Sequence, residues 1–196
     1  MIETGARRRE IDEVASELFH ANGYAATSVR DIARALDIQG ASLYAHVASK
    51  EDVLWSIVDR AASAFEQRAD EATLETTNAD PVERLAALVE AHVDVVTADP
   101  ERASVFVTEW RHLSPDRRAA IGERRDAYER RYRDVIEDGI SVGAFRALDP
   151  AIAATFLLTA LNGIATWYRQ DGRLGADRIA DNYVDLALRS LSEAHR

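Results

Sequence analysis

The sequence predicts an all-α protein of about nine helices, with a small three-helix head followed by a larger helical body. Three observations predict this fold class. Apolar residues recur every three or four positions along most of the chain, which is the spacing of amphipathic helices. No segment alternates strictly between apolar and polar residues, as a half-buried strand does. Short polar segments, several of them containing proline, separate the helical patterns.

The composition indicates a globular protein with a large negative charge. The chain has 196 residues, of which 24 are basic and 34 acidic, and a formal net charge of −10. Residues 1–50 contain six basic and seven acidic residues, so most of the excess negative charge lies in the rest of the chain. Phosphate contacts supply much of the affinity of proteins for DNA, so only the near-neutral head is suited to bind it. An arginine arm at residues 7–9 can approach the DNA backbone. The acidic body is expected to repel DNA.

Other features of the composition concern the cellular compartment. The chain has no cysteine, which excludes disulfides and thiolate metal sites and is typical of a reducing compartment. The N-terminus has arginines but no apolar signal core, and no apolar run is expected to reach the length of a membrane span. We therefore expect a cytoplasmic protein with no membrane association and no processed leader.

The head is expected to begin with two helices and a sharp bend. The first helix covers residues 6–22, and an Asn-Gly pair ends it. Ser28 can cap the second helix, whose apolar side chains share one face. These side chains are Val29, Ile32, Ala33 and Leu36. The pattern breaks at residues 37–40, where Gly40 is expected to supply the backbone angles of the bend.

The third helix is expected over residues 41–47 and has an unusual free face. Leu43 and Val47 are expected to point inward, whereas the other side chains are small, hydrogen-bonding or aromatic. Such a face suits the DNA major groove, where helix-turn-helix proteins place their second helix. Ser49 then opens the next helix, three residues before Asp52, in an arrangement like a capping box.

The remainder of the chain is expected to form six further helices, most of which begin near a proline in the first turn. They are expected at residues 49–73, 81–97, 100–113, 115–141, 150–170 and 177–194. The charged runs within residues 115–141 are interpreted as a solvated face with ion pairs at i,i+4 spacing. The basic run at residues 130–133 is alternatively a DNA-binding patch, but the acidic residues around it make this the weaker interpretation.

The last two helices carry more apolar surface than the core of one protomer requires. This excess predicts a self-complementary four-helix seam between two copies of the chain. A dimer also allows two short reading helices to reach successive major grooves, about 34–36 Å apart. The residues predicted to form the seam are Leu157, Leu161, Ile164, Tyr168, Tyr183, Leu186, Ala187 and Leu191.

Two runs of the sequence resemble a known family. T-S-V-R-D-I-A at residues 27–33 and S-L-Y-A-H-V-A-S-K-E at residues 42–51 are similar to the DNA-binding head of the tetracycline-repressor (TetR) family of bacterial one-component regulators. The resemblance implies a helix-turn-helix domain at residues 1–50, a connecting helix at 49–73, and an effector-binding and dimerisation domain at 74–196. It also implies a homodimeric repressor without a cofactor, which a small hydrophobic effector releases from a pseudo-palindromic DNA operator.

The resemblance assigns DNA contacts residue by residue. The family's phosphate-contact positions are occupied by Thr27, Ser28, Arg30 and Lys50. Its base-reading and backbone-contact positions are occupied by Gln39, Gly40, Ala41, Ser42, Tyr44, Ala45 and His46. The side-chain chemistry agrees, since Gln39 can read adenine and Tyr44 suits a phosphate. Ala45 is smaller than the residue that the family often has there, so base reading is expected to depend partly on DNA shape.

Apolar and aromatic residues of the middle helices are candidates for an effector pocket, because small-molecule sites combine such surface with few polar anchors. The candidates are Phe65, His92, Phe106, Trp110, Tyr128, Phe156, Asn162 and Trp167. A plain core has the same composition, so each candidate is alternatively a core residue, and His92 is alternatively a satisfied core histidine. The run at residues 166–174 resembles a branch of the family that senses acyl-coenzyme A thioesters, from which Leu158, Asn162 and Thr166 depart.

Two other classes of function stay open as alternatives. The sequence has no nucleophile elbow, phosphate loop, dinucleotide fingerprint or zinc-protease motif, which argues against an enzyme. Glu109 and His112, together with His92, imitate a carboxylate–histidine metal site, but a structural role is favoured and no metal is expected. An all-helical protein–protein adaptor would also suit the acidic surface. Sequence-specific DNA binding that a small molecule reverses distinguishes a regulator from both alternatives.

Overall fold

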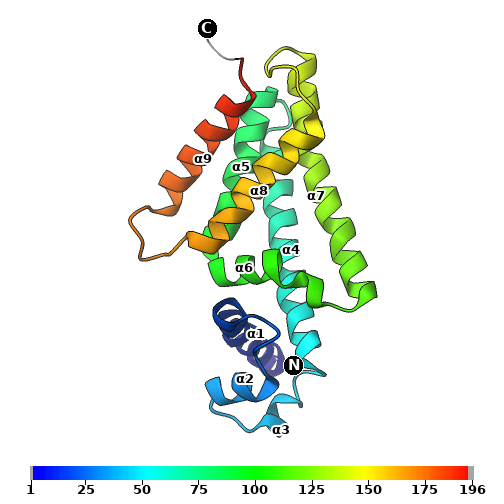
Figure 1. Ribbon diagram of the computed structural model, residues 1–196, viewed down its shortest axis with the longest axis vertical. Coiled ribbons are helices and arrows are strands. Elements are labelled where there is room, and N and C mark those ends of the chain that lie inside the picture. The colour runs from blue at the N-terminus through cyan, green and yellow to red at the C-terminus, as the bar shows by residue number, and fades with distance from the viewer. Residues whose placement is uncertain (1, 194–196) are drawn as a thin grey trace. The chain divides into compact units, whose positions relative to one another are not determined.

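The computed structural model describes residues 2–193, and within that range the regular structure is entirely helical (Figure 1). The elements are α1 (Ile2–Asn22), α2 (Val29–Ala35), α3 (Gly40–Leu43), α4 (Lys50–Glu75), α5 (Pro81–Ala98), α6 (Pro100–Thr108), the 3₁₀ turn η1 (Trp110–His112), α7 (Pro115–Ser141), α8 (Pro150–Trp167) and α9 (Ala176–Leu191). The nine α-helices of this range confirm the predicted all-α fold class.

Most predicted helices are confirmed within a few residues, and several ends differ. α9 ends at Leu191, whereas its predicted end at residue 194 lies outside the described residues. α1 begins at Ile2 rather than at residue 6. The helix expected over 100–113 is broken, because α6 ends at Thr108 and η1 follows it. α8 ends at Trp167 rather than at residue 170, because Tyr168 adopts extended backbone angles while its N–H still donates to the Ile164 carbonyl.

Aspartates cap α5 and α8, two of the helices that begin with proline. Asp80 precedes Pro81, and its carboxylate accepts hydrogen bonds from the backbone N–H groups of Val82 and Glu83 at 2.8 and 2.9 Å. Asp149 caps α8 in the same way. The proline lacks the N–H group that would lie free at the first helical position, so an Asp-Pro pair satisfies the start of each helix.

Packing divides the chain into two compact units, which are described separately. The first unit contains the residues up to 62 and residues 101–122. The second contains residues 63–100 and the residues from 123 onward. α4 and α7 therefore contribute residues to both units. The division inferred from the family resemblance, at residues 50 and 74, stays a prediction.

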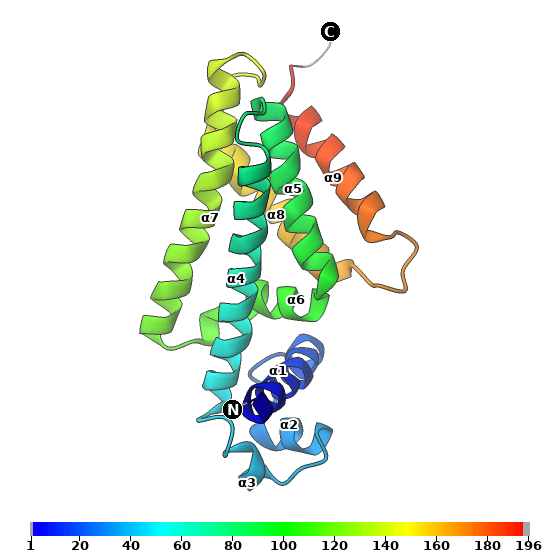
Figure 2. The same cartoon turned by 180° about the vertical axis from the view of Figure 1, so that it is seen from behind.

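In the first unit, α1, α2 and α3 gather around the N-terminal part of α4 (Figures 1 and 2). The largest fully buried side chains of this unit are Ile11, Phe19, Ile32, Leu43, Leu54, Ile57 and Ile121. The apolar faces predicted for the head helices therefore meet in one small core. This core fixes α2 and α3 while leaving their other faces in solvent.

In the second unit, α5 packs against both α8 and α9, which Figure 2 shows from behind. Leu85, Tyr132, Ile136, Leu161 and Ile164 are fully buried there. By length and composition α8 would also suit a membrane span, so the expectation that no segment reaches that length is wrong for this helix. Its packing against α5 and α9 accounts for part of its apolar character, while Ile152, Phe156 and Trp167 lie exposed.

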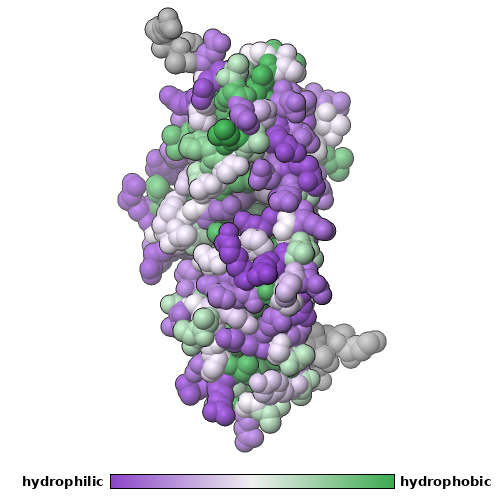
Figure 3. Space-filling view, turned by 45° about the vertical axis from the view of Figure 1, so that its right-hand side comes forward, coloured by the Kyte–Doolittle hydropathy of each residue, from purple (hydrophilic) through white to green (hydrophobic). Residues whose placement is uncertain are grey.

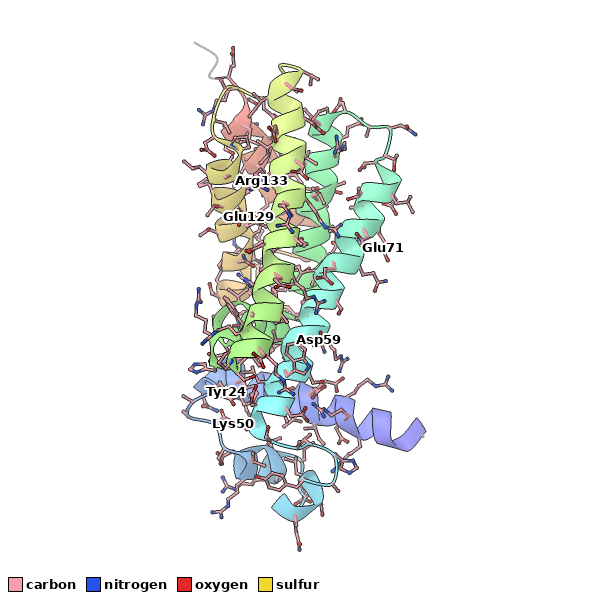
Figure 4. All side chains as sticks on the ribbon, turned by 90° about the vertical axis from the view of Figure 1, so that its right-hand side faces the viewer. Tyr24, Lys50, Asp59, Glu71, Glu129 and Arg133 are labelled. Carbon is pink, nitrogen blue, oxygen red and sulfur yellow. The ribbon has the colours of Figure 1, made fainter. Side chains whose placement is uncertain are left out.

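The exposed side of α7 carries mostly charged residues, as the sequence predicted. Glu129 and Arg133, one turn apart, lie on this side in Figure 4. Arg131 forms an ion pair with Asp70 at 2.6 Å, so the basic run at 130–133 is partly neutralised within the protein. Ion pairs of this exposed kind contribute little to stability. On the face drawn in Figure 3, hydrophobic residues are scattered among hydrophilic ones.

The C-terminal end of α7 depends on close packing at a glycine. The backbone N–H groups of Ala144 and Phe145 donate to the Gly139 carbonyl at 2.8 and 3.1 Å, and Gly143 has a φ of 76°, which glycine adopts without strain. The turn brings the Phe145 ring onto Gly139, where any Cβ atom would overlap it. Phe145 is buried, so it has little room to move away.

We expect Gly139→Ala to destabilise the protein by about 1–3 kcal/mol, because overpacking forces the Phe145 ring or the backbone to shift. Gly122→Ala is the matched control in the same helix, since a Cβ there meets no atom within 4 Å. The control should be neutral or stabilising by up to about 1 kcal/mol, because alanine favours helices. Urea unfolding measures both changes, and equal stabilities would contradict the packing argument.

Candidate nucleic-acid interface and effector core

The start of α2 is fixed by a capping box. Ser28 Oγ accepts a hydrogen bond from the Asp31 backbone N–H at 3.2 Å, and the Asp31 carboxylate accepts one from the Ser28 backbone N–H at 2.9 Å. The Ser28 hydroxyl also donates to Asp31 at 2.6 Å, and these hydrogen bonds hold the pKa of Asp31 below its usual value. The predicted cap at Ser28 is confirmed.

The bend between α2 and α3 differs from the prediction. Asp37 takes the left-handed conformation, with a φ of 52°, whereas Gly40 has no positive φ and begins α3. The N–H groups of Asp37 and Ile38 close the end of α2 by donating to the carbonyls of Arg34 and Ala33 at 3.1 and 3.0 Å. An aspartate tolerates this conformation better than most residues, so the expectation that Gly40 supplies the bend is wrong.

α3 is shorter than predicted, because only residues 40–43 are α-helical. After Leu43 the chain continues in tight turns, in which the N–H groups of Ala45 and His46 donate to carbonyls three residues earlier at 3.3 and 2.9 Å. These turns place Val47 back in the core. The predicted inward side chains, Leu43 and Val47, are therefore both buried although the predicted helix over 41–47 is not formed in full.

The opposite side of this segment is solvent-exposed. The predicted base-reading residues that lie exposed are Gln39, Ala41, Ser42, Tyr44 and Ala45. Tyr44 exposes 57% of its surface, which is unusual for a large ring without a partner. A hollow of about 390 Å³ lies at the start of this segment, lined by Arg30, Arg34, Asp37 and Gln39 among others. Exposed polar and aromatic groups beside arginines are suited to a DNA groove and its phosphates.

Three of the four predicted phosphate contacts bind the protein's own backbone. The Thr27 side chain is buried, and its hydroxyl donates to the carbonyls of Leu18 and Gly23. Lys50 Nζ donates to the Tyr24 and Thr27 carbonyls at 2.9 Å each and lies 4.0 Å from the centre of the Tyr24 ring (Figure 4). With Ser28 in its capping box, these side chains order the loop before α2. Ser28 and Arg30 are the exposed members of the set, and Arg30 is the exposed cation.

Arg8 links three parts of the first unit, and sequence reasoning missed it. Its guanidinium donates to the Asp52 carboxylate at 3.0 Å, to the Asp52 carbonyl at 2.8 Å and to the Asp12 carboxylate at 3.1 Å. It also donates to the His46 carbonyl at 3.4 Å. His46 ends the segment of predicted base-reading residues, 39–46, which we call the reading segment. Asp12 is 1% exposed and also accepts from the Ser56 hydroxyl at 2.6 Å. The i,i+4 spacing of Arg8 and Asp12 was the available signal.

The expected arginine arm at residues 7–9 is therefore not a uniform DNA-facing element. Arg7 pairs with Glu10 at 2.6 Å, Arg8 is held inside the unit, and Arg9 is exposed. Of the three, Arg9 has the exposure that a phosphate contact requires.

The residues suggested as a metal site instead fasten η1 to the head loop. Glu109 accepts a hydrogen bond from the Tyr24 backbone N–H at 3.3 Å, and His112 lies 3.4 Å from the same carboxylate. The His112 and Tyr24 rings stack with centroids 5.2 Å apart. Among the described residues, no group of three metal-ligating side chains occurs, and His92 belongs to the other unit.

A second attachment lies at the start of α7. The Glu51 carboxylate accepts a hydrogen bond from the Ser114 backbone N–H at 3.0 Å and pairs with Arg117 at 3.3 Å. The bond from Ser114 is the main reason why the pKa of Glu51 is lowered. Together with Glu109, this contact explains why residues 101–122 pack with the head rather than with the rest of the chain.

Buried aromatic and polar side chains of the second unit form a cluster around His92. His92 is 2% exposed, its Nδ1 lies 3.2 Å from the Tyr128 hydroxyl, and its ring centroid is 4.7 Å from that of Phe65. Burial, with the nearby Arg125 charge as a smaller cause, lowers the pKa of His92 to about 3. The ring is therefore neutral at physiological pH. Its other nitrogen, Nε2, is buried and has no hydrogen-bond partner.

The other predicted effector contacts do not all join this cluster. Phe106 and Trp110 belong to the first unit. Phe156 and Trp167 expose 58% and 48% of their surface on α8, and Asn162 is partly buried. The prediction that the eight residues share one pocket therefore does not hold for Phe156 and Trp167.

The residues predicted on α8 for the dimer seam lie on the buried side of that helix rather than on its exposed side. Leu157, Leu161 and Ile164 are buried within the protomer, as are Ala187 and Leu191 of α9. The predicted residues that remain at the surface are Leu186, which is 62% exposed, and the partly buried Tyr168 and Tyr183. The reason is that α8 is apolar over a wide arc, and the arc chosen from the sequence faces α5 and α9.

The exposed arc of the last two helices is nonetheless apolar. Ile152 and Phe156 expose 70% and 58% of their surface on α8, on the side opposite the buried leucines. A hollow of about 420 Å³ lies between α8 and α9, lined by Phe156, Tyr183 and Leu186 among others. Patches of exposed large apolar residues mark interaction surfaces in soluble proteins.

A capped helix, a tight bend and a short helix with an exposed polar face define a helix-turn-helix DNA-binding protein with a helical body. Family models agree with this class. Residues 11–56 match the model described as bacterial regulatory proteins, tetR family, and residues 78–191 match the tetracyclin repressor-like C-terminal domain. The chain belongs to the TetR family. It is a DNA-binding transcriptional regulator rather than an enzyme, of a family whose members act as dimers on operator DNA.

Named relatives span the whole chain. The transcriptional repressor KstR2 of Rhodococcus jostii (strain RHA1) is 30% identical over 96% of this chain and 93% of its own length. The structure of the ketosteroid transcriptional regulator KstR2 of Mycobacterium tuberculosis has a TM-score of 0.89 at 29% identity, covering 95% of each chain. The structure of AibR in complex with isovaleryl coenzyme A and operator DNA has a TM-score of 0.80 at 30% identity, covering 92% of this chain and 97% of that one.

We expect Arg8→Ala to weaken operator binding about tenfold, because charge-assisted hydrogen bonds that position the reading segment are lost. The slope of the logarithm of the binding constant against the logarithm of the salt concentration should stay unchanged. Arg8 is bound to Asp12 and Asp52 within the protein and is not expected to contact a DNA phosphate. Arg9→Ala is the comparison variant. Arg9 is exposed, so its removal should delete a contact with the DNA phosphates and lower that slope. Fluorescence anisotropy over a salt series measures both variants. A reduced slope for Arg8→Ala would mean that Arg8 binds DNA directly.

Proposed function

We propose that the protein is a repressor that binds a pseudo-palindromic operator as a homodimer, with residues 39–46 in the major groove, and leaves DNA when a small hydrophobic effector binds. The observation that carries this proposal is the division of that short segment. Leu43 and Val47 are buried, while Gln39 and Tyr44 are exposed. Gln39 also lines a hollow together with Arg30, Arg34 and Asp37. An exposed face held so rigidly by a small core is suited to reading DNA.

Within this segment, different side chains take different roles. Gln39 is exposed and has the amide geometry that reads adenine. Tyr44 and Arg30 contact phosphates and fix the register. Thr27, Ser28 and Lys50 act mainly by ordering the backbone, whose N–H groups at the start of α2 face the phosphates. Gly40, Ala41, Ser42, Ala45 and His46 approach the DNA closely because their side chains are small or partly buried.

The proposed effector is an acyl-coenzyme A thioester. One relative supports this class, since AibR is described in complex with isovaleryl coenzyme A. KstR2, described as a ketosteroid transcriptional regulator, supports a hydrophobic effector more generally. Residues 166–174 resemble the acyl-coenzyme A branch of the family, and Arg169 in this run is 78% exposed on its side chain. In this proposal the acyl group enters the helical body near Phe65, His92 and Tyr128.

Release requires that the effector bind one conformation of the protein better than the other. The contacts of Glu109 with Tyr24 and of Glu51 with Ser114 tie residues 101–122 to the head. These contacts are the proposed path by which a shift of α6 or α7 reaches the reading segment. We also propose the domain division at residues 50 and 74, and a cytoplasmic location, in keeping with binding to chromosomal DNA.

The proposed dimer surface is the exposed arc of α8 and α9, centred on Ile152, Phe156, Tyr183 and Leu186. This arc replaces Leu157, Leu161 and Ile164, which face the protomer's own core. The two-fold mates of these helices form the four-helix seam.

We expect Gln39→Ala to relax the operator preference at one base pair and to cost about 1–3 kcal/mol there, because one bidentate contact is removed. Tyr44→Phe should instead weaken binding to all sequences alike. Gln67→Ala, which removes an exposed glutamine from α4, is the control. Binding to a set of single-base variants of the operator measures all three. An unchanged profile for Gln39→Ala would exclude it as a reader.

We expect Leu186→Glu to shift the protein from dimer to monomer, because two carboxylates would face each other across an apolar seam. Leu74→Glu is the matched control, since Leu74 is also exposed, at 78%, but lies on α4. Sedimentation velocity at micromolar concentration measures the shift. A dimer of unchanged stability in Leu186→Glu would place the seam elsewhere.

A further inference from the structure

Asp37, at the bend between α2 and α3, is an unfavourable residue for the fold alone. Its φ of 52° is the left-handed conformation, which glycine adopts without strain and in which most other residues lose stability. The backbone N–H of Asp37 donates to the Arg34 carbonyl at 3.1 Å, and a glycine would supply the same hydrogen bond. The fold therefore gives no reason for a carboxylate at this position.

The Asp37 side chain also has no partner within the protein. It is exposed, and no hydrogen bond or ion pair joins its carboxylate to any other residue that the structure describes. Arg34 lines the same hollow but pairs with Asp31 instead, at 3.1 Å. The hollow that Gln39 lines therefore also holds a carboxylate that is free to accept hydrogen bonds.

The same hollow contains a glycine that the fold does not require. Gly40 has no positive φ, and a Cβ atom built on it meets no atom within 4 Å. Gly40 begins α3, where an alanine would form the helix more readily. Since Gly40 lines the hollow together with Asp37, its missing side chain leaves room for a group from outside the protein to approach the carboxylate.

The chemistry of the major groove indicates which group this is. Because phosphates repel a carboxylate, such a side chain is favourable at a DNA interface only opposite a hydrogen-bond donor. The donors in the major groove are the amino groups of cytosine and adenine. Adenine presents the acceptor N7 beside its amino group, and a carboxylate is repelled by that lone pair, whereas cytosine presents the donor alone. Cytosine is therefore the base that a carboxylate suits best.

We propose, on the basis of the proposed function, that Asp37 is a specificity residue whose carboxylate accepts a hydrogen bond from the N4 amino group of a cytosine in each operator half-site. Opposite any other base, the carboxylate is still repelled by the phosphates and gains less. Asp37 is then a second base reader beside Gln39, and it discriminates by opposing wrong sequences as well as by binding the right one.

Operators that differ at one base pair in both half-sites test the proposal, with the full-length protein and fluorescence anisotropy as the binding assay. The wild-type protein should favour cytosine about tenfold at one base pair of each half-site. Replacing that cytosine by 2-pyrimidinone, which lacks only the amino group, should weaken binding to a similar extent. Asp37→Gly should bind the cytosine operator more weakly and the other operators more tightly, so that the preference disappears.

Three comparisons assign the preference to the carboxylate. Glycine adopts the left-handed conformation without strain, so thermal unfolding should show that Asp37→Gly is at least as stable as the wild type. Asp37→Asn keeps an oxygen that can accept and should retain part of the preference. Glu13→Gln removes an exposed carboxylate of the same head that does not line the hollow, and it should retain the full preference.

The outcomes separate this inference from the proposed function. If Asp37→Gly binds every operator more tightly by one common factor, the carboxylate only repels phosphates and the inference is wrong. If Gln39→Ala relaxes the preference at its base pair while no base pair responds to Asp37→Gly, the inference is wrong and the proposed function stands. If the wild-type protein shows no preference among the operators, the proposed function fails and the inference fails with it.

Discussion

A buried carboxylate holds the DNA-binding head together. Asp12 is 1% exposed, and an isolated charge at such a place would be strongly unfavourable. Arg8, Ser56 and Arg60 satisfy it, from α1 and from α4. Because each partner lies on a defined turn of its helix, the charge fixes the axial register of α1 on α4 as well as their proximity.

The reading segment depends on this register because it cannot be stable alone. Four α-helical residues form barely one turn, and isolated helices of that length do not persist in water. The C-terminal end of α2 holds the segment at its start, and the buried Leu43 side chain holds it in the middle. At its far end it is held by the buried Val47 side chain and by the hydrogen bond from Arg8 to the His46 carbonyl. The exposed face that Gln39 and Tyr44 form is therefore positioned by a buried core and by a charge cluster, neither of which contacts DNA.

The sequence predicted those features of the fold that depend on local chemistry. The start of α2 follows from the Ser28 side chain, whose oxygen satisfies a backbone N–H group nearby in the chain. The starts of α5 and α8 follow from Pro81 and Pro150 in the first helical turn. The inward residues of the head follow from helical spacing alone. The length of α3 does not, because a chain can keep Val47 inward by tight turns as well as by a helix.

The misassigned residues on α8 have one physical cause. Helical periodicity identifies an amphipathic stripe, but α8 is apolar over so wide an arc that the pattern cannot say which part faces the protomer's core. The sequence therefore predicts Leu157 as a dimer residue and Phe156 as a pocket residue, whereas the first is buried and the second exposed. The roles of Arg8, Lys50 and Glu109 in the head were missed for another reason. Their bonds to Asp52, to Tyr24 and Thr27, and to Tyr24 join residues that are far apart in sequence, and only the i,i+4 pair of Arg8 with Asp12 leaves a local signal.

The distribution of positive charge bears on how the regulator responds. Lys50 and Arg8 bind the protein's own oxygens, and Arg34 pairs with Asp31 at 3.1 Å, so few cations of each head are available for phosphates. The formal charge of the whole chain is −10, which opposes binding further. Each head alone should therefore bind DNA weakly, and stable binding should require both heads of a dimer at once. Since such binding is lost when the heads no longer match the spacing of the two half-sites, a modest change in the body is sufficient to release the operator.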